Sequence, residues 1–137
     1  MKDSDIKSVL ITDERLAAKV AEMGAQISKD YQGRKLIILG VLKGSVVFMS
    51  DLIRSITVPV EMDFMAVSSY GAGVKTSGVV KIVKDLDRLI AGYDVLVVED
   101  ILDSGMTLSY ITELLRERDP ASISIATLLD KPDRRKV

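Results

Sequence analysis

Apolar residues follow two different spacings along this chain, and the change between them marks the expected elements. Between a possible cap at Thr12 and a stop at Gly33, they recur every three or four residues, which predicts an amphipathic helix. Leu36 to Val41 is a continuous apolar run, typical of a strand buried on both faces. A glycine-bounded turn, Gly40 to Gly44, then leads into a second helix. The helical stripes consist of Leu16, Val20, Met23, Ile27 and Tyr31, and of Met49, Leu52, Ile53 and Ile56.

An alternating pattern begins after Pro59 and predicts extended structure. Ser68 to Gly78 is rich in glycine and serine and is expected to form a loop. Val79 to Val83 resumes the extended pattern, so the loop would join two antiparallel strands. The apolar members of the first strand are Val60, Met62, Phe64 and Ala66.

The remainder of the chain reads as strand, helix and strand. Tyr93 to Val98 is a buried strand, Asp119-Pro120 stops the following helix, and Ile123 to Leu129 is a last strand. Strands alternating with helices predict an α/β fold with a mainly parallel central sheet flanked by helices. Ligands of such sheets bind beyond the carboxyl ends of the strands, which points to the loops after residues 41, 67, 98 and 129. The predicted helix that ends at Asp119-Pro120 has Leu108, Ile111 and Leu115 on its inner face.

Composition narrows the chemistry that this domain can carry. The 137 residues suit one domain, and they include neither histidine nor cysteine. This excludes a Ser-His or Cys-His pair, a disulfide framework and a His/Cys zinc site. A formal net charge of -1 argues against a nucleic-acid partner. Without a signal peptide or a membrane-length apolar run, a cytoplasmic protein is expected.

The richest segment for chemistry is VVEDILDSGMT, residues 97–107. An apolar strand delivers three carboxylates within five residues, and a small hydroxyl-bearing turn then opens a helix. Unsatisfied amides at a helix N-terminus can wrap a phosphate, and the acids before them suit ribose hydroxyls or a divalent metal. The alternative is that Asp103 or Ser104 only caps the helix, which leaves the other acids unexplained.

This segment resembles the phosphoribosyl-diphosphate-binding motif of type I phosphoribosyltransferases, and its EDILDSG form resembles the hypoxanthine-guanine branch. GVLKGS at 40–45, SSYG at 68–71 and LLDKP at 128–132 follow in the family's order. The resemblance implies purine salvage: hypoxanthine or guanine plus 5-phosphoribosyl 1-diphosphate would give IMP or GMP and pyrophosphate. It also implies the family fold with a flexible antiparallel lid loop, and a homodimer or homotetramer.

The resemblance implies a role for each matching residue. Glu99 and Asp100 would bind the ribose hydroxyls and the linked Mg²⁺. Asp103 would exchange a proton with N7 of the purine. The 5′-phosphate would lie against Asp103 and the turn after it, formed by Ser104, Gly105, Met106 and Thr107. Relatives often have lysine where Met106 stands, so phosphate binding here would rely on amides and hydroxyls.

Three further segments receive roles in the same way. Lys131 would donate to the 6-oxo group of the purine. Ser69 and Tyr70 would belong to the lid that excludes water from an oxocarbenium-like state. Pyrophosphate would contact Leu42, Lys43 and Gly44, a loop in which the family often has a strained non-proline cis bond.

The sequence leaves several alternatives open. Gly40 to Gly44 could be a plain strand-to-helix turn, Ser68 to Gly78 an idle hairpin loop, and Lys131 part of a solvated basic tail. The protein could act on xanthine or another base, be an RNA-binding regulator on the same fold, or be a catalytically dead core. Relatives continue into a C-terminal segment with a purine-stacking aromatic and a metal-binding Asp, so a truncated domain over 1–137 is expected.

Overall fold

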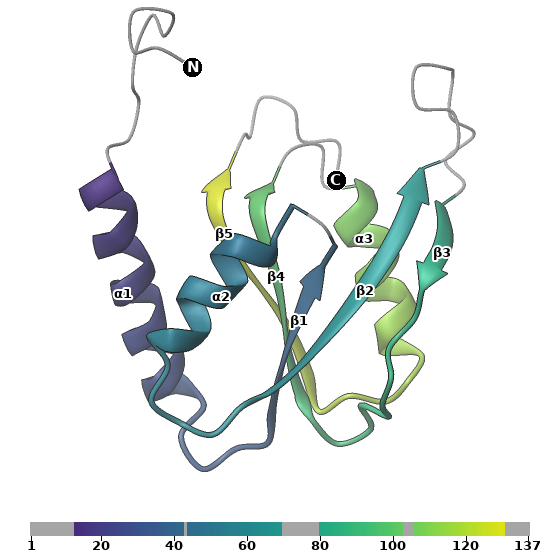
Figure 1. Ribbon diagram of the computed structural model, residues 1–137. Coiled ribbons are helices and arrows are strands. Elements are labelled where there is room, and N and C mark those ends of the chain that lie inside the picture. The colour runs from purple at the N-terminus through teal and green to yellow at the C-terminus, as the bar shows by residue number, and fades with distance from the viewer. Residues whose placement is uncertain (1–12, 43, 70–79, 103–105, 131–137) are drawn as a thin grey trace, which may run out of the picture.

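The computed structural model describes residues 13–42, 44–69, 80–102 and 106–130. Its strands form one sheet in the order β3-β2-β1-β4-β5, in which β3 alone runs antiparallel to its neighbour. Figure 1 shows the carboxyl ends of the parallel strands together at the upper edge of the sheet. This confirms the predicted α/β fold. The elements are α1 (Asp13–Asp30), β1 (Leu36–Val41), α2 (Val46–Arg54), β2 (Glu61–Ser69), β3 (Val80–Lys84), β4 (Asp94–Leu102), α3 (Met106–Arg116) and β5 (Ser122–Asp130).

Two hydrophobic cores lie on opposite faces of the sheet, which makes the domain a three-layer structure. Leu36 and Ile38 of β1 pack toward α1 and α2, whereas Ile37 and Leu39 pack toward α3. Successive strand residues point to opposite faces, so a strand covered by helices on both sides must be apolar throughout. The continuous apolar run of β1 is therefore explained by its central position.

Gly40 allows the carboxyl end of β1 to pack closely against its neighbours. A Cβ at this position would lie 3.0 Å from the Phe64 ring of β2 and would clash with the Met49 sulfur of α2. Glycine is found where another group approaches the backbone of a strand this closely. The missing side chain therefore lets Phe64 of β2 and Met49 of α2 pack against the end of β1 that the sequence associates with ligand binding.

The structure corrects the predicted exposure of β2. The alternation set Met62 and Phe64 apart from polar or exposed positions; Phe64 is half-buried and packs against the core on the α1–α2 face, but Met62 is 49% exposed. The buried side chains belong to the alternate residues: Asp63 is 5% exposed, and Met65 is fully buried in the α3-side core. Tertiary packing overrides the pattern because the side chain of Asp63 finds hydrogen-bond partners inside the fold.

Several element boundaries also differ from the predictions. Ser68 and Ser69, expected in the loop, belong to β2, because they pair with Lys81 and Val80 of β3. β4 runs on through the acidic motif to Leu102, which pairs with Asp130 of β5. Ile56 lies just beyond α2 and still packs against the core.

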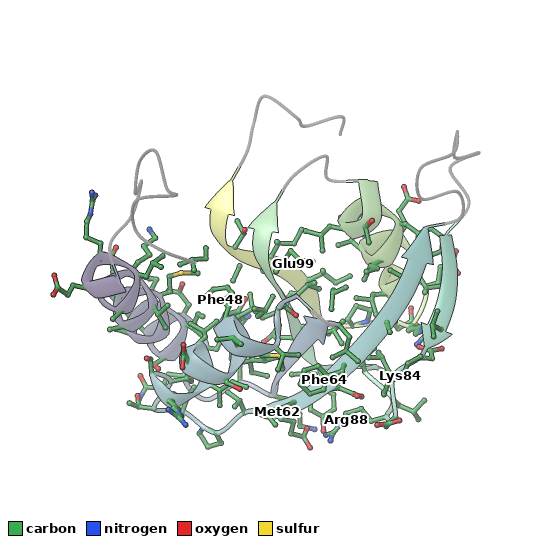
Figure 2. The ribbon with its side chains drawn as sticks, turned by 45° about the horizontal axis from the view of Figure 1, so that its top comes forward. Phe48, Met62, Phe64, Lys84, Arg88 and Glu99 are labelled. Carbon is green, nitrogen blue, oxygen red and sulfur yellow. The ribbon has the colours of Figure 1, made fainter. Side chains whose placement is uncertain are left out.

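Asp63 is the hub of a charged network in the first half of β2. Its carboxylate accepts hydrogen bonds from the amides of Phe64 (2.8 Å) and Asp87 (3.0 Å). The ammonium of Lys84 and the guanidinium of Arg88 lie 3.9 and 3.8 Å from its oxygens. Figure 2 shows both cations beside this part of the sheet. The network fastens the segment after β3 to β2 and satisfies a carboxylate that burial would otherwise destabilise.

Candidate active site

Two segments that the sequence singled out come together at the carboxyl edge of the sheet. β1 and β4 are parallel neighbours, and Gly40 pairs with Val98. Glu99 lies one residue after this pair and Leu42 two residues after it, so both lie at the same edge. The structure therefore brings the GVLKGS loop next to the acidic motif, although more than fifty positions separate them in the sequence.

Glu99 lies on β4 where the buried core gives way to the open edge (Figure 2). Its side chain is half-buried, and it pairs across the strands with Thr127 of β5, which is also half-buried. Val97, two residues earlier on the same face, is fully buried in the core below α3. A carboxylate in this position is held by a rigid strand and can still reach a ligand beyond the sheet.

The loop from β1 to α2 is anchored by two hydrogen bonds. The amide of Leu42 donates to the carbonyl of Met65 on β2 over 2.9 Å. The hydroxyl of Ser45 donates to the carbonyl of Val41 over 2.6 Å, which closes the loop on itself. Gly44 is exposed between these anchors, so the loop has a fixed base and an accessible backbone.

Thr107 lies in the first turn of α3, at the same edge. Its side chain is half-buried, and Leu108 beside it is buried in the core between α3 and the sheet. The first amides of a helix have no intrahelical partners and lie at the positive end of its dipole. This end of α3 therefore has the local chemistry expected for the phosphate site.

The other predicted site residues are placed only in part. Asp100 lies in β4, Ser69 ends β2 and Met106 begins α3. The roles proposed for them remain predictions, as do those of the residues outside the described part of the chain: Lys43, Tyr70, Asp103, Ser104, Gly105 and Lys131.

Two polar residues at this edge, Ser45 and Thr127, had no role predicted from the sequence. Ser45 closes the GVLKGS loop, and it was visible as the last letter of that motif. Thr127 could have been noticed as a hydroxyl near the carboxyl end of the last predicted strand. Its position opposite Glu99 depends on the β4–β5 register, which no local pattern reveals.

The pKa shifts resolved among the described residues lie elsewhere in the fold. Hydrogen bonds from Tyr93 and Arg88 lower the pKa of Glu61, and the bond to Glu61 raises the pKa of Tyr93. The guanidinium of Arg118 holds the pKa of Asp85 below its usual value through two hydrogen bonds of 2.8 Å. These pairs fasten the β3–β4 connection to β2 and to the end of α3, so their role is structural.

Oxygen donors at the site suit a hard cation. Within the ranges described, no three His, Cys, Asp or Glu side chains converge as a metal cluster. Mg²⁺ is commonly held by one or two carboxylates together with substrate phosphates, so a site for it needs no preformed cage of three side chains. None of the helices placed in the structure is long and apolar enough to span a membrane.

Known proteins similar to this chain identify its family. Residues 9–137 match the model of the phosphoribosyl transferase domain. The hypoxanthine-guanine phosphoribosyltransferase of Mycobacterium tuberculosis is 53% identical over 135 residues, which cover 94% of this chain and 67% of that protein. The Bacillus subtilis enzyme of the same name is 53% identical over 136 residues, covering 99% of this chain and 76% of that enzyme. The chain belongs to the hypoxanthine-guanine phosphoribosyltransferase family.

Solved structures of this family agree with the architecture. A hypoxanthine phosphoribosyltransferase from Staphylococcus aureus superimposes with a TM-score of 0.93 at 52% identity, over 98% of this chain and 73% of that one. The phosphoribosyltransferase fold expected from the motifs is therefore confirmed. The carboxyl edge of the sheet becomes the candidate active site of a family enzyme.

Proposed function

We propose that this chain transfers the phosphoribosyl group of 5-phosphoribosyl 1-diphosphate to hypoxanthine or guanine. A ring nitrogen of the purine forms a bond to the anomeric carbon as the bond from that carbon to pyrophosphate breaks. The products are IMP or GMP and pyrophosphate, so the enzyme would serve purine salvage. The observation that carries this proposal is the 53% identity to enzymes named for this activity, extending over nearly the whole chain.

The phosphoribosyl half of the site is supported by the geometry of the sheet edge. Glu99, held on β4, and Asp100 after it would accept hydrogen bonds from the ribose 2′ and 3′ hydroxyls. The start of α3 at Thr107 would hold the 5′-phosphate together with Asp103 and the turn before the helix. Leu42, Lys43 and Gly44 would contact pyrophosphate from the loop after β1.

The remaining site residues are assigned by their match to the family motifs. Asp103 would accept the proton that N7 of the purine gives up in the transfer. Lys131 would donate to the 6-oxo group, which favours hypoxanthine and guanine over adenine. Ser69 and Tyr70 would belong to a lid that excludes water from the electron-poor anomeric carbon.

Mg²⁺ is the cofactor in this proposal, and Glu99 and Asp100 are the residues that would hold it. When bound with the substrate, it would neutralise charge on the departing pyrophosphate. Carboxylate oxygens and substrate phosphates are the ligands that this ion prefers. The absence of histidine and cysteine from the sequence is therefore no obstacle to the reaction.

The same proposal covers the organisation of the protein. One catalytic core domain over residues 1–137 is proposed from the chain length, a homodimer or homotetramer from the family resemblance, and a cytoplasmic location from the sequence pattern. The two cores on the faces of a single sheet support one domain over the described residues.

A spectrophotometric assay tests the proposed activity directly. The chain is mixed with 5-phosphoribosyl 1-diphosphate, Mg²⁺ and one of hypoxanthine, guanine, xanthine or uracil. We expect turnover of hypoxanthine and guanine, and Asp51→Asn, on the exposed side of α2, should match the parent chain. Faster turnover of xanthine or uracil would overturn the base assignment. Tight RNA binding without turnover of any base would overturn the enzyme assignment.

A further inference from the structure

We propose that Ser45 is a positioning residue for the diphosphate: its hydroxyl fixes the loop after β1 in the shape that presents the backbone of Leu42 and Gly44. The inference rests on the proposed function, in which this loop contacts pyrophosphate. It assigns Ser45 no contact with the substrate. The role is to hold the loop in place.

The first observation is what the Ser45 hydroxyl does at the start of α2. A serine at a helix N-cap usually accepts a hydrogen bond from an amide in the first helical turn. Ser45 occupies the N-cap of α2, with φ -82° and ψ -5°, but its side chain makes no capping bond. It donates backward to the carbonyl of Val41, over 2.6 Å. The hydroxyl therefore closes the loop and does not cap the helix.

The second observation is that this hydrogen bond is shielded from water. Ser45 is fully buried, and Val41 is 6% exposed. A buried hydroxyl or a buried carbonyl that is left without a partner destabilises the folded state. Water has little access to replace the bond, so the loop geometry and the bond depend on each other.

The third observation is that both ends of the loop are tied to rigid elements. The Leu42 amide donates to Met65 of β2 over 2.9 Å, and the carbonyl of Ser45 accepts from the Met49 amide of α2 over 2.8 Å. Gly44, between them, is exposed. A binding loop held in one shape loses less conformational entropy when its ligand binds.

The chain provides a matched control at the other end of the same helix. Ser55 is the C-cap residue of α2, and its hydroxyl also donates to the carbonyl four residues earlier, at Asp51, over 3.3 Å. That bond is exposed and closes no loop at the sheet edge. Ser45→Ala and Ser55→Ala therefore remove the same atom and the same type of bond, but only Ser45→Ala releases the loop.

The experiment measures pyrophosphate binding by calorimetric titration in the presence of Mg²⁺, together with the steady-state constants. We expect Ser45→Ala to weaken pyrophosphate binding and raise the KM for 5-phosphoribosyl 1-diphosphate roughly tenfold. The KM for hypoxanthine should stay unchanged if the variant affects only the loop. A general loss of structure would instead raise the KM values of both substrates. Ser55→Ala should leave all of these constants at the parent values. Equal pyrophosphate affinities in the two variants would overturn the inference.

Two further variants keep the test decisive. If Ser45→Ala does not fold, Ser45→Cys keeps the branching of the side chain, with a larger atom, and replaces a strong donor with a weak one. A folded Ser45→Cys chain with parent affinity for pyrophosphate would overturn the inference. Lys43→Ala tests the loop assignment itself. If it weakens pyrophosphate binding and Ser45→Ala does not, only the role of Ser45 fails; if neither variant does, the proposed loop contact fails as well.

Discussion

Glu99 of β4 lies directly opposite Thr127 of β5, and both side chains are half-buried at the carboxyl edge of the sheet. In-register residues of neighbouring strands lie side by side on the same face. A carboxylate and a hydroxyl that are twenty-eight residues apart in the sequence therefore lie side by side in the candidate site. This relationship supports Glu99 as a fixed ligand for the ribose and gives the first prediction.

We expect Glu99→Gln to raise the KM for 5-phosphoribosyl 1-diphosphate by roughly tenfold to a hundredfold, because hydrogen bonds to a charged acceptor are worth about 1.5–3 kcal/mol. The KM for the purine base should change much less. Steady-state kinetics with each substrate varied in turn measure both. Glu113→Gln, on the exposed side of α3, is the matched control. A parent-like KM in Glu99→Gln would remove Glu99 from the site.

Asp103→Asn should lower turnover by roughly 10²- to 10⁴-fold, the range typical of losing a general acid or base. The amide keeps the shape of the side chain but cannot accept the N7 proton, so affinity for 5-phosphoribosyl 1-diphosphate should change little. Single-turnover kinetics and direct substrate binding separate the two effects, with Asp51→Asn as control. Intact turnover in Asp103→Asn would show that another group handles the proton.

Gly24→Ala should destabilise the fold, although a glycine-to-alanine change inside a helix usually stabilises it by about 1 kcal/mol. A Cβ at Gly24 of α1 would lie 2.7 Å from the backbone carbonyl oxygen of Ser55, at the end of α2. The helices must separate to make room, so we expect a net loss of about 1–3 kcal/mol in the free energy of unfolding. Urea denaturation measures it.

The control for this change is Ala25→Gly, at the neighbouring exposed position of α1. It should lose about 1 kcal/mol through helix propensity alone. If Gly24→Ala instead raised the unfolding free energy, the close approach of α1 to the end of α2 would be wrong.

The Asp85–Arg118 pair should make stability depend on pH in the acid range. Arg118 holds the pKa of Asp85 below 3.8, its ordinary value, so the folded protein binds this proton less readily than the unfolded chain. The stabilisation is present above that value and is lost as the pH falls through the folded pKa. Because both side chains are partly exposed, we expect about 0.5–1 kcal/mol at pH 7.

Asp85→Asn tests this dependence by chemical denaturation at neutral pH and at about pH 2. The stability difference from the parent chain should be present at neutral pH and should shrink toward zero in acid. Asp51→Asn serves as the control for losing an exposed carboxylate. A difference of the same size at both pH values would show that Asp85 acts through packing and not through its charge.

Local patterns predicted much of the fold because helices and strands bury side chains with different periods. The stripe matched the structure from Val20 to Ile27, and the unbroken run of β1 is buried throughout. In β2 two residues departed from the pattern: Met62 is exposed, and Asp63 is buried with hydrogen bonds from Phe64 and Asp87. Asp87 is twenty-four residues away, so the local sequence around Asp63 does not contain this partner.

The candidate site divides in the same way. The sequence by itself determined the chemistry: carboxylates and hydroxyls near Glu99, a glycine-bounded loop at Gly40 to Gly44, and no histidine or cysteine. Only the tertiary structure decided that β1 and β4 are neighbours, that Thr127 lies opposite Glu99, and that Ser45 closes its loop onto Val41. The physical reason is that residue type and local spacing are carried by the chain, whereas strand order, register and buried hydrogen bonds arise when the whole core packs.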